Sequence, residues 1–290
     1  MKVWKEYTIA NTIDQARKSM DDSTAPAYFI AGGSDLLIEI QQGRRAPASK
    51  FVDLSQIPEL NRLYLDAEGL FIGASVPVST ITKSKIVYEH AQAVTEATGL
   101  IGGPQVRNVA TLGGNVAHAL PAADGMIALA AMDANARVAN GFLIEDRHIL
   151  TLFSGPGKTA LNKNEIIIGF LIKIKQPHEG SAFKRIMRPQ GVALPILNCA
   201  VWLKRINDSI SDIRIIFGPS GPVPTRAMEV EKELRNKEFN NSNLENSINA
   251  VRNTVKFRTS PRRATAEYRY NLAESLLKDV IQTAWERASE

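Results

Sequence analysis

Two glycine-rich turns constrain this chain more than any other part of its sequence. The longer stretch, Thr111–Asp124, has two adjacent glycines, then small residues, and then an aspartate that opens an apolar helical run. Glycine lets the backbone adopt positive φ and approach a ligand closely, and the N–H groups of such a turn form an anion cradle. A second turn, Ala31–Asp35, follows the apolar run Tyr28–Ile30. We therefore expect the two turns to hold one pyrophosphate between them.

Each of these features also has a purely structural interpretation. Glycine pairs occur in ordinary tight turns, so the pattern alone leaves cofactor binding and a plain loop both open. Asp124 has two interpretations as well, because a carboxylate in this place accepts hydrogen bonds from a ribose or caps the helix that follows it.

The composition limits the kinds of site that the chain can hold by itself. The 290 residues are 44% hydrophobic, enough for more than one apolar core, and the net charge of +5 is spread along the chain, which argues against a nucleic-acid surface. The single cysteine, Cys199, lies in a predicted buried strand, which excludes a disulfide framework, cysteine-ligated zinc and an iron–sulfur cluster held by this chain alone. The N-terminal residues lack a signal-peptide core, and no run approaches the roughly 18 apolar residues of a membrane span. We expect a cytoplasmic protein that does not enter a membrane.

Short strands and helices alternate through the first part of the sequence. A capping-box pattern at Thr12–Gln15 predicts a helix start, and Asn140–Gly141 predicts a hairpin turn between strands at 136–139 and 142–144. Apolar periodicity and breaker residues predict the other elements. They are strands at 28–31, 51–54, 69–74 and 165–174, and helices at 36–40, 88–100 and 126–132.

Polar and breaker residues at Gln176–Ser181 mark the expected boundary between two parts of the chain. The first part is 1–176, with subdomains of about 1–57 and 58–176, and the second part is 177–290. The second part should contain strands at 182–187, 196–203 and 213–217, and then helices at 225–235, 243–256 and 264–287. We therefore expect an α+β fold whose C-terminal domain combines a three-stranded antiparallel sheet with helices.

Other candidate motifs lead to no catalytic or metal site. Gly155–Ala160 resembles the end of a phosphate-binding loop, but Leu152 stands where that motif needs its first glycine, so we expect a structured surface turn facing a partner or cofactor. Of the four histidines only His118 lies in a suggestive place, and no two have ligand spacing. No pattern for a nucleophilic serine or cysteine is present. We expect no bound metal and no catalytic acid or base.

The two turns and their flanking residues resemble the FAD-binding medium subunits of the molybdenum hydroxylases, the xanthine dehydrogenase and carbon monoxide dehydrogenase group. The family pattern Ala-Gly-Gly-Thr-Asp-Leu corresponds to Ala31–Leu36, and its longer pattern, from Arg-Asn-x-Ala-Thr to a final Asp, corresponds to Arg107–Asp124. The similarity continues through Phe153–Thr159 and Phe183–Arg188, so it covers essentially the whole chain.

The resemblance implies a fold, a cofactor and partners. In this family FAD lies between two α+β subdomains, and a C-terminal domain with a three-stranded sheet and helices follows. The flavin receives electrons from iron–sulfur clusters of a small subunit, which takes them from a molybdenum centre in a large subunit, and commonly passes them to NAD+. The implied contacts are the backbone of Ala31, Gly32, Gly33, Ser34, Asp35, Leu36, Thr111, Gly113 and Gly114, with Asn115 and His118 against the cofactor, Asp124 on a ribose hydroxyl, and Lys184 and Arg188 beside the isoalloxazine end.

Two positions depart from the family pattern. Leu120 replaces the serine that often precedes Pro121, so a hydroxyl contact near the phosphates is expected to be missing. Pro189–Val192 replaces a charged pair near the expected flavin face, which affects the flavin potential or the choice of acceptor. The main interpretation is an electron-transfer subunit, and the alternatives are a stand-alone FAD oxidoreductase and a scaffold that has lost flavin. Retention of both turns and Asp124 argues against the scaffold.

Overall fold

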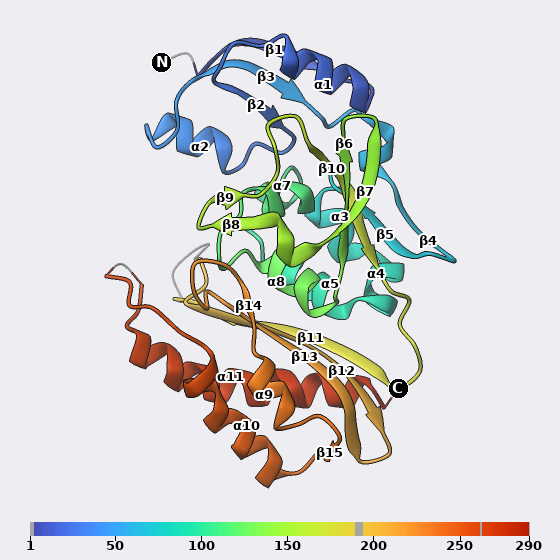
Figure 1. The fold of residues 1–290 in the computed structure, drawn as a ribbon, viewed down its shortest axis with the longest axis vertical. Helices are drawn as coiled ribbons and strands as arrows, with labels where there is room; N and C mark the ends of the chain where they lie inside the picture. The colour runs from blue at the N-terminus through green and yellow to red at the C-terminus, as the bar shows by residue number, and fades with distance from the viewer. Residues whose placement is uncertain (1–2, 189–193, 262, 290) are drawn as a thin grey trace.

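Three larger β-sheets, each with its own helices, follow one another in chain order in the computed structural model (Figure 1). The structure describes residues 3–188, 194–261 and 263–289. The fold is α+β, as the sequence predicts. Pro189–Val192, one of the two departures from the family pattern, lies outside the described residues.

The N-terminal layer is a parallel sheet with the strand order β1-β3-β2. Its first helix begins where the capping pattern predicts, because the Thr12 hydroxyl accepts a hydrogen bond from the amide of Gln15 at 3.1 Å. Strand β1 is not among the predicted strands, and most of its residues are exposed. The elements of this layer are β1 (Trp4–Ile9), α1 (Ile13–Asp21), β2 (Ala27–Ile30), α2 (Leu36–Gln41) and β3 (Ala48–Asp53).

The middle layer is an antiparallel sheet with the order β4-β5-β10-β6-β7, together with six helices, two 3₁₀ helices and the small β8–β9 pair. Its elements are η1 (Pro58–Asn61), β4 (Leu63–Asp66), β5 (Gly69–Gly73), α3 (Val78–Lys83), α4 (Lys85–His90), α5 (Gln92–Gly99), α6 (Pro104–Arg107), α7 (Leu112–Ala117), α8 (Asp124–Ala131), β6 (Asn135–Asn140), β7 (Leu143–His148), η2 (Ile149–Leu152), β8 (Phe153–Gly155), β9 (Lys158–Thr159) and β10 (Ile166–Ile172).

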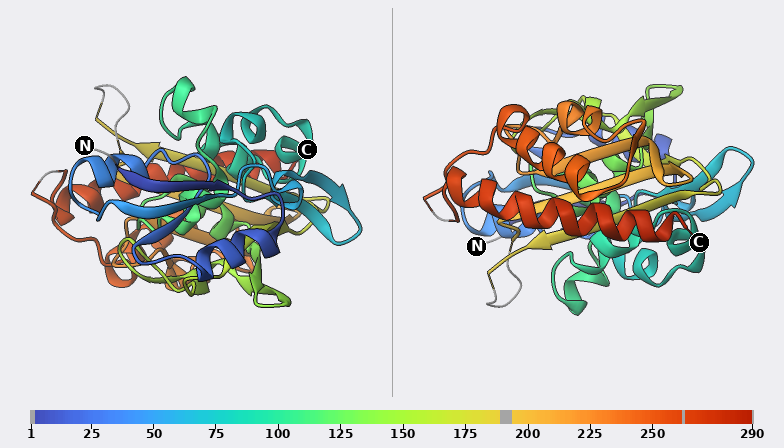
Figure 2. Two further views of the ribbon diagram at one scale, coloured as in Figure 1. Left: turned by 90° about the horizontal axis from the view of Figure 1, so that it is seen from above. Right: turned by 90° about the horizontal axis from the view of Figure 1, so that it is seen from below.

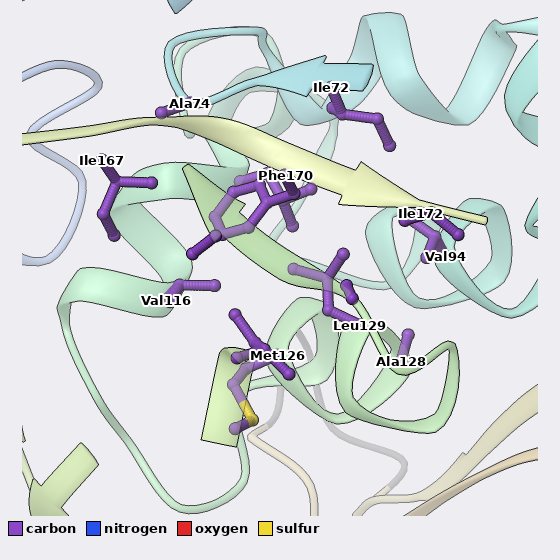
Figure 3. Packing of buried hydrophobic residues seen from close by; sticks show 14 of the residues in the cluster. Ile72, Ala74, Val94, Val116, Met126, Ala128, Leu129, Ile167, Phe170 and Ile172 are labelled. Atoms are coloured by element: carbon purple, nitrogen blue, oxygen red, sulfur yellow. The ribbon is translucent and has the colours of Figure 1, made fainter. Parts of the chain in front are cut away.

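The main apolar core lies between this sheet and helices α5, α7 and α8. Figure 3 shows Phe170 of β10 facing the helices, with Val116, Met126 and Leu129 gathered in the same layer. Every residue of α8 is buried, as its all-round apolar sequence predicts. The helix contacts β12 and β13 on its other side, so it joins the middle layer to the C-terminal one.

The C-terminal layer is built on three long antiparallel strands, with two-residue strands added along β13. Alternate residues of β12 point to opposite faces: Cys199 and Val201 pack in the cluster that includes α11, whereas Ala200 and Trp202 join the main core. Figure 2 shows α11 running across this sheet. The elements are β11 (Glu179–Ile186), β12 (Leu197–Ile206), β13 (Ser209–Gly218), β14 (Thr225–Arg226), α9 (Met228–Lys232), β15 (Lys237–Glu238), α10 (Asn241–Thr254) and α11 (Ala266–Arg287).

Three predicted elements differ from the structure. The helix predicted at 88–100 is two helices, α4 and α5, because the backbone of Ala91 (φ −148°, ψ 60°) is not helical and separates them. The helix predicted at 225–235 is wrong at its start, where Thr225 and Arg226 pair with β13 and leave only α9 as a helix. In the hairpin, Asn140 pairs with Leu143, so the loop is one residue later than predicted and Gly141 (φ +65°) is its first residue.

No helix among the described residues has both the length and the apolar character needed to span a bilayer. The described ranges likewise contain no group of three or more histidine, cysteine and acidic side chains with metal-binding geometry.

Candidate functional site

The two glycine turns pack directly against each other, although they are far apart in the sequence. A Cβ atom on Gly32 would lie 2.0 Å from the carbonyl oxygen of Val109, so only glycine allows this contact. The next residue, Gly33, has a φ of +66°, in the left-handed region that glycine adopts without strain. Glycine is therefore required in the first turn both for close packing and for its backbone shape.

The first turn presents a row of unused backbone donors. In the described part of the chain, the amides of residues 32–36 donate to no acceptor, and Asp35 makes no side-chain cap to helix α2. Consecutive free N–H groups in such a turn attract anionic oxygens. This row is the observation that most directly supports a phosphate site.

The second turn is a short helix, not an open loop. Residues 112–117 form α7, and the Thr111 hydroxyl caps it by accepting from the amide of Gly114 at 3.0 Å. A side chain on Gly113 would collide with Ala74, at 2.6 Å from its Cβ, whereas a Cβ on Gly114 would meet only Thr111 Oγ1, at 3.1 Å. Gly113 thus serves packing, and Gly114 keeps a surface clear of side chains.

A cleft with a volume of about 380 Å³ opens in front of both turns. Apolar residues of β2, the turns and β10 form much of its wall, and the polar groups come mainly from the turns and from residues 159–165. The cleft brings together most of the predicted site: Ala31, Gly32, Gly33, Ser34, Asp35, Leu36, Thr111, Gly113, Gly114, Asn115 and His118.

Asp124 is not among the cleft-lining residues. It is the first residue of α8, whose N-cap is Ala123, so it does not cap the helix either. Its carboxylate is buried, pairs with the Arg185 guanidinium, and accepts from the amide of Asn198 at 2.7 Å. Burial raises the pKa of Asp124, and the two donors oppose that rise. This cluster ties α8 to β11 and β12.

Lys184 and Arg188 also lie outside the cleft lining. The ammonium of Lys184 pairs with Asp279 of α11 at 2.5 Å, and Arg188 Nη2 donates to the carbonyl of Arg263 at 3.2 Å. Both side chains therefore interact with the C-terminal helical region. Asn115, in contrast, lines the cleft. Its Oδ1 atom accepts a hydrogen bond from the amide of Met126 at 3.2 Å and so supports the start of α8.

One wall of the cleft was missed in the sequence analysis. Glu165 is buried there and accepts from Arg147 Nη1 at 3.0 Å and Nη2 at 2.6 Å, and from the amide of Asn162 at 2.8 Å. The Arg147 hydrogen bonds are the largest cause that lowers the pKa of Glu165 to about 2. The sequence around Glu165 does not mark it as part of the site, because its partner, Arg147, lies on a different strand, β7.

The Gly155–Ala160 turn is a structured turn, as predicted. The amide of Gly157 donates to the carbonyl of Ala119 at 2.9 Å, which fastens this turn to the longer glycine stretch, and Thr159 lines the cleft. Leu120, the residue after Ala119, packs against the main core.

A set of charged side chains stands at one side of the cleft. Glu39 of α2 accepts from Arg45 Nε at 2.9 Å and lies 3.6 Å from His118 Nε2, so it connects the two turns through their flanking residues. Both Arg45 and His118 line the cleft.

The arrangement meets the requirements of a dinucleotide site. Free amides and clear glycine surfaces suit a pyrophosphate, and apolar walls suit flat rings. Fold and cleft thus define a nucleotide-binding protein whose ligand would lie between two α+β layers.

Comparison with known proteins identifies the family. Residues 3–172 match the FAD binding domain in molybdopterin dehydrogenase, and residues 181–284 match the CO dehydrogenase flavoprotein C-terminal domain. The chain belongs to the FAD-binding subunits of the molybdenum hydroxylases, a family of oxidoreductases, and FAD is the cofactor of this subunit.

Individual relatives align over nearly the whole chain. The xanthine dehydrogenase FAD-binding subunit of Escherichia coli O157:H7 is 31% identical over 282 residues, which cover 96% of this chain and 95% of the relative. The carbon monoxide dehydrogenase medium chain of Hydrogenophaga pseudoflava is 26% identical and covers 98% of each chain. A solved structure of carbon monoxide dehydrogenase from that organism superposes with a TM-score of 0.92 at 25% identity, over 97% of each chain.

Proposed function

We propose that this chain transfers electrons through FAD within a molybdenum hydroxylase complex. The electrons would come from iron–sulfur clusters of a small partner subunit, which a large molybdenum subunit reduces, and would pass to NAD+ or another acceptor. The observation that carries the proposal is the row of free amides at residues 32–36, which lines the same cleft as the clear surface of Gly114. The names of the relatives, which include medium chains and FAD-binding subunits, support the division of labour.

The residues of both turns would hold the FAD. The amides of residues 32–36 would bind the pyrophosphate, and the backbone of Thr111, Gly113 and Gly114 would close the other side, with Asn115 and His118 against the cofactor. FAD, when bound, supplies both one-electron and two-electron chemistry. The task of the chain is then to place the cofactor and to exclude water from the cleft.

The predicted contacts of Asp124, Lys184 and Arg188 with FAD need a different arrangement from the one seen here. Each side chain has a partner in the protein, and none lines the cleft. We propose that Asp124 contacts a ribose hydroxyl only if its carboxylate gives up the hydrogen bond that it accepts from Asn198. The other two would approach the isoalloxazine end only by leaving the C-terminal helical region.

The source of electrons must lie outside this chain. Cys199 is its single cysteine, and burial raises the pKa of its thiol well above the usual range, so it is no cluster ligand.

We also propose the division into 1–176, with subdomains of about 1–57 and 58–176, and 177–290. The matched family regions end at 172 and begin again at 181, on either side of that boundary.

One purification tests the proposal against its alternatives. The chain is prepared alone and together with the products of neighbouring genes, its bound cofactor is extracted, and its flavin is tested for reduction by NADH. We expect about one FAD per chain and reduction by NADH. Well-folded protein without FAD would favour a scaffold, and turnover of an organic substrate by the isolated chain would favour a stand-alone oxidoreductase.

A further inference from the structure

Arg269, near the start of α11, is a buried cation with two guanidinium nitrogens that have no hydrogen-bond acceptor among the described residues. The residue is 1% exposed, and its Nε and Nη1 atoms are both buried and unpartnered in the described part of the chain. Most buried guanidinium groups in proteins are paired, because an isolated buried charge is strongly unfavourable. The position therefore lacks an anion.

The described residues around Arg269 add positive charge, and no carboxylate among them forms an ion pair with it. Arg258 and Arg263, on the segment between α10 and α11, repel the charge of Arg269. Burial, and then these two cations, lower the pKa of Arg269, and burial and Arg258 lower the pKa of Arg263. The acidic residue of the first turn of α11, Glu267, is engaged with Arg252 at 3.0 Å.

Two other arginines with largely buried side chains have acceptors for their terminal nitrogens, although Arg185 Nε is unpartnered as well. Arg185 pairs with the Asp124 carboxylate, and Arg214 donates to the carbonyl of Ala131 at 2.9 Å and lies 3.7 Å from Asp133. The same chain thus provides partners for comparable cations elsewhere.

The three arginines lie apart from the flavin cleft. None of them lines it. Figure 1 shows the segment between α10 and α11 at the end of the C-terminal layer where β11 finishes, and the bond from Arg188 to the carbonyl of Arg263 joins the two segments. The phosphates of FAD therefore do not supply the missing anion.

We propose that Arg258, Arg263 and Arg269 form a binding site for a carboxylate group of a partner polypeptide. A carboxylate matches the planar fork of a guanidinium, and here it would lie among the exposed Arg258, the half-buried Arg263 and the buried Arg269. The inference rests on the proposed function only in requiring a partner subunit. It assigns that partner an acidic side chain or terminus at this end of the C-terminal layer.

The direction in which the thermal midpoint changes when Arg269 is replaced tests whether this cation lacks an anion. Arg269→Met in the full-length chain, without partners, removes an unpaired buried charge but keeps an apolar side chain, so the thermal midpoint should rise by at least about 2 °C. Arg252→Met is the matched control, because that exposed guanidinium is already paired with Glu267, and it should leave the midpoint unchanged or slightly lower. A lowered midpoint in an Arg269→Met protein that keeps the wild-type near-UV circular dichroism would overturn the proposal, since it would show that the chain itself satisfies this cation.

A surface variant keeps the proposal testable if the methionine does not pack. In the wild type, sodium acetate should raise the midpoint more than sodium chloride at equal ionic strength, and the double variant Arg258→Ala/Arg263→Ala should lose that difference. The double variant should also weaken association with the co-expressed partner subunits about tenfold or more. A larger response to phosphate than to acetate, or unchanged association, would refute the carboxylate assignment. FAD content should stay the same in every variant, so loss of flavin from the wild type would count against the proposed function instead.

Discussion

Replacing Gly114 by valine should separate cofactor binding from folding. A Cβ atom at this position meets only Thr111 Oγ1, at 3.1 Å, so the fold has to shift that hydroxyl by only a few tenths of an ångström to accept it. Gly114 is inside α7, and valine has the better helix propensity by a few tenths of a kcal/mol, which offsets the crowding of Thr111. We expect the free energy of unfolding without FAD to change by less than about 1 kcal/mol.

The same side chain should nearly abolish FAD binding. Its methyl groups would stand in the cleft where the pyrophosphate has to approach the amides. Losing two charge-assisted hydrogen bonds of about 1.5–3 kcal/mol each raises Kd by roughly 10² to 10⁴-fold. Flavin content after purification and titration of the apoprotein with FAD measure the effect. Gly155→Val is the matched control, because a Cβ there meets only Lys158 Cδ, at 3.9 Å, outside the cleft lining. An FAD affinity within threefold of wild type in Gly114→Val would show that the cradle is misplaced.

Three further predictions concern the structure around the cleft. Gly32→Ala should destabilise the fold by about 1–3 kcal/mol in urea unfolding, because its Cβ would lie 2.0 Å from the Val109 carbonyl; an unchanged midpoint would contradict the packing of the two turns. Arg185→Met should cost about 3–5 kcal/mol by leaving Asp124 buried without its cation, and adding Asp124→Asn should recover much of the loss; no recovery would argue against the pair. Glu165 has a depressed folded-state pKa, so its contribution of at most about 3 kcal/mol is present above pH 4.5 and is lost as pH falls toward 2; Glu165→Gln should flatten that decline in acid unfolding, and an identical profile would contradict it.

Local sequence patterns predicted the elements that carry the site. The glycines of both turns, the capping pattern at Thr12 and the apolar run of α8 each act within a few residues, where backbone sterics and periodic burial leave a direct mark. The same patterns missed the break at Ala91 and the short strand at Thr225–Arg226. In both places neighbouring packing, not local preference, decides the backbone conformation.

The sequence by itself therefore determined that the chain has a glycine turn after a strand, a second glycine-rich stretch, a buried helix and a C-terminal sheet, because these depend on short-range spacing. Only the tertiary structure decided what the polar side chains contact. Asp124 accepts hydrogen bonds from Arg185 and Asn198, which are 61 and 74 residues away. Glu165 accepts them from Arg147 on another strand. A buried charge takes whichever donor the packing of distant segments brings within reach, and residue spacing carries no record of that contact.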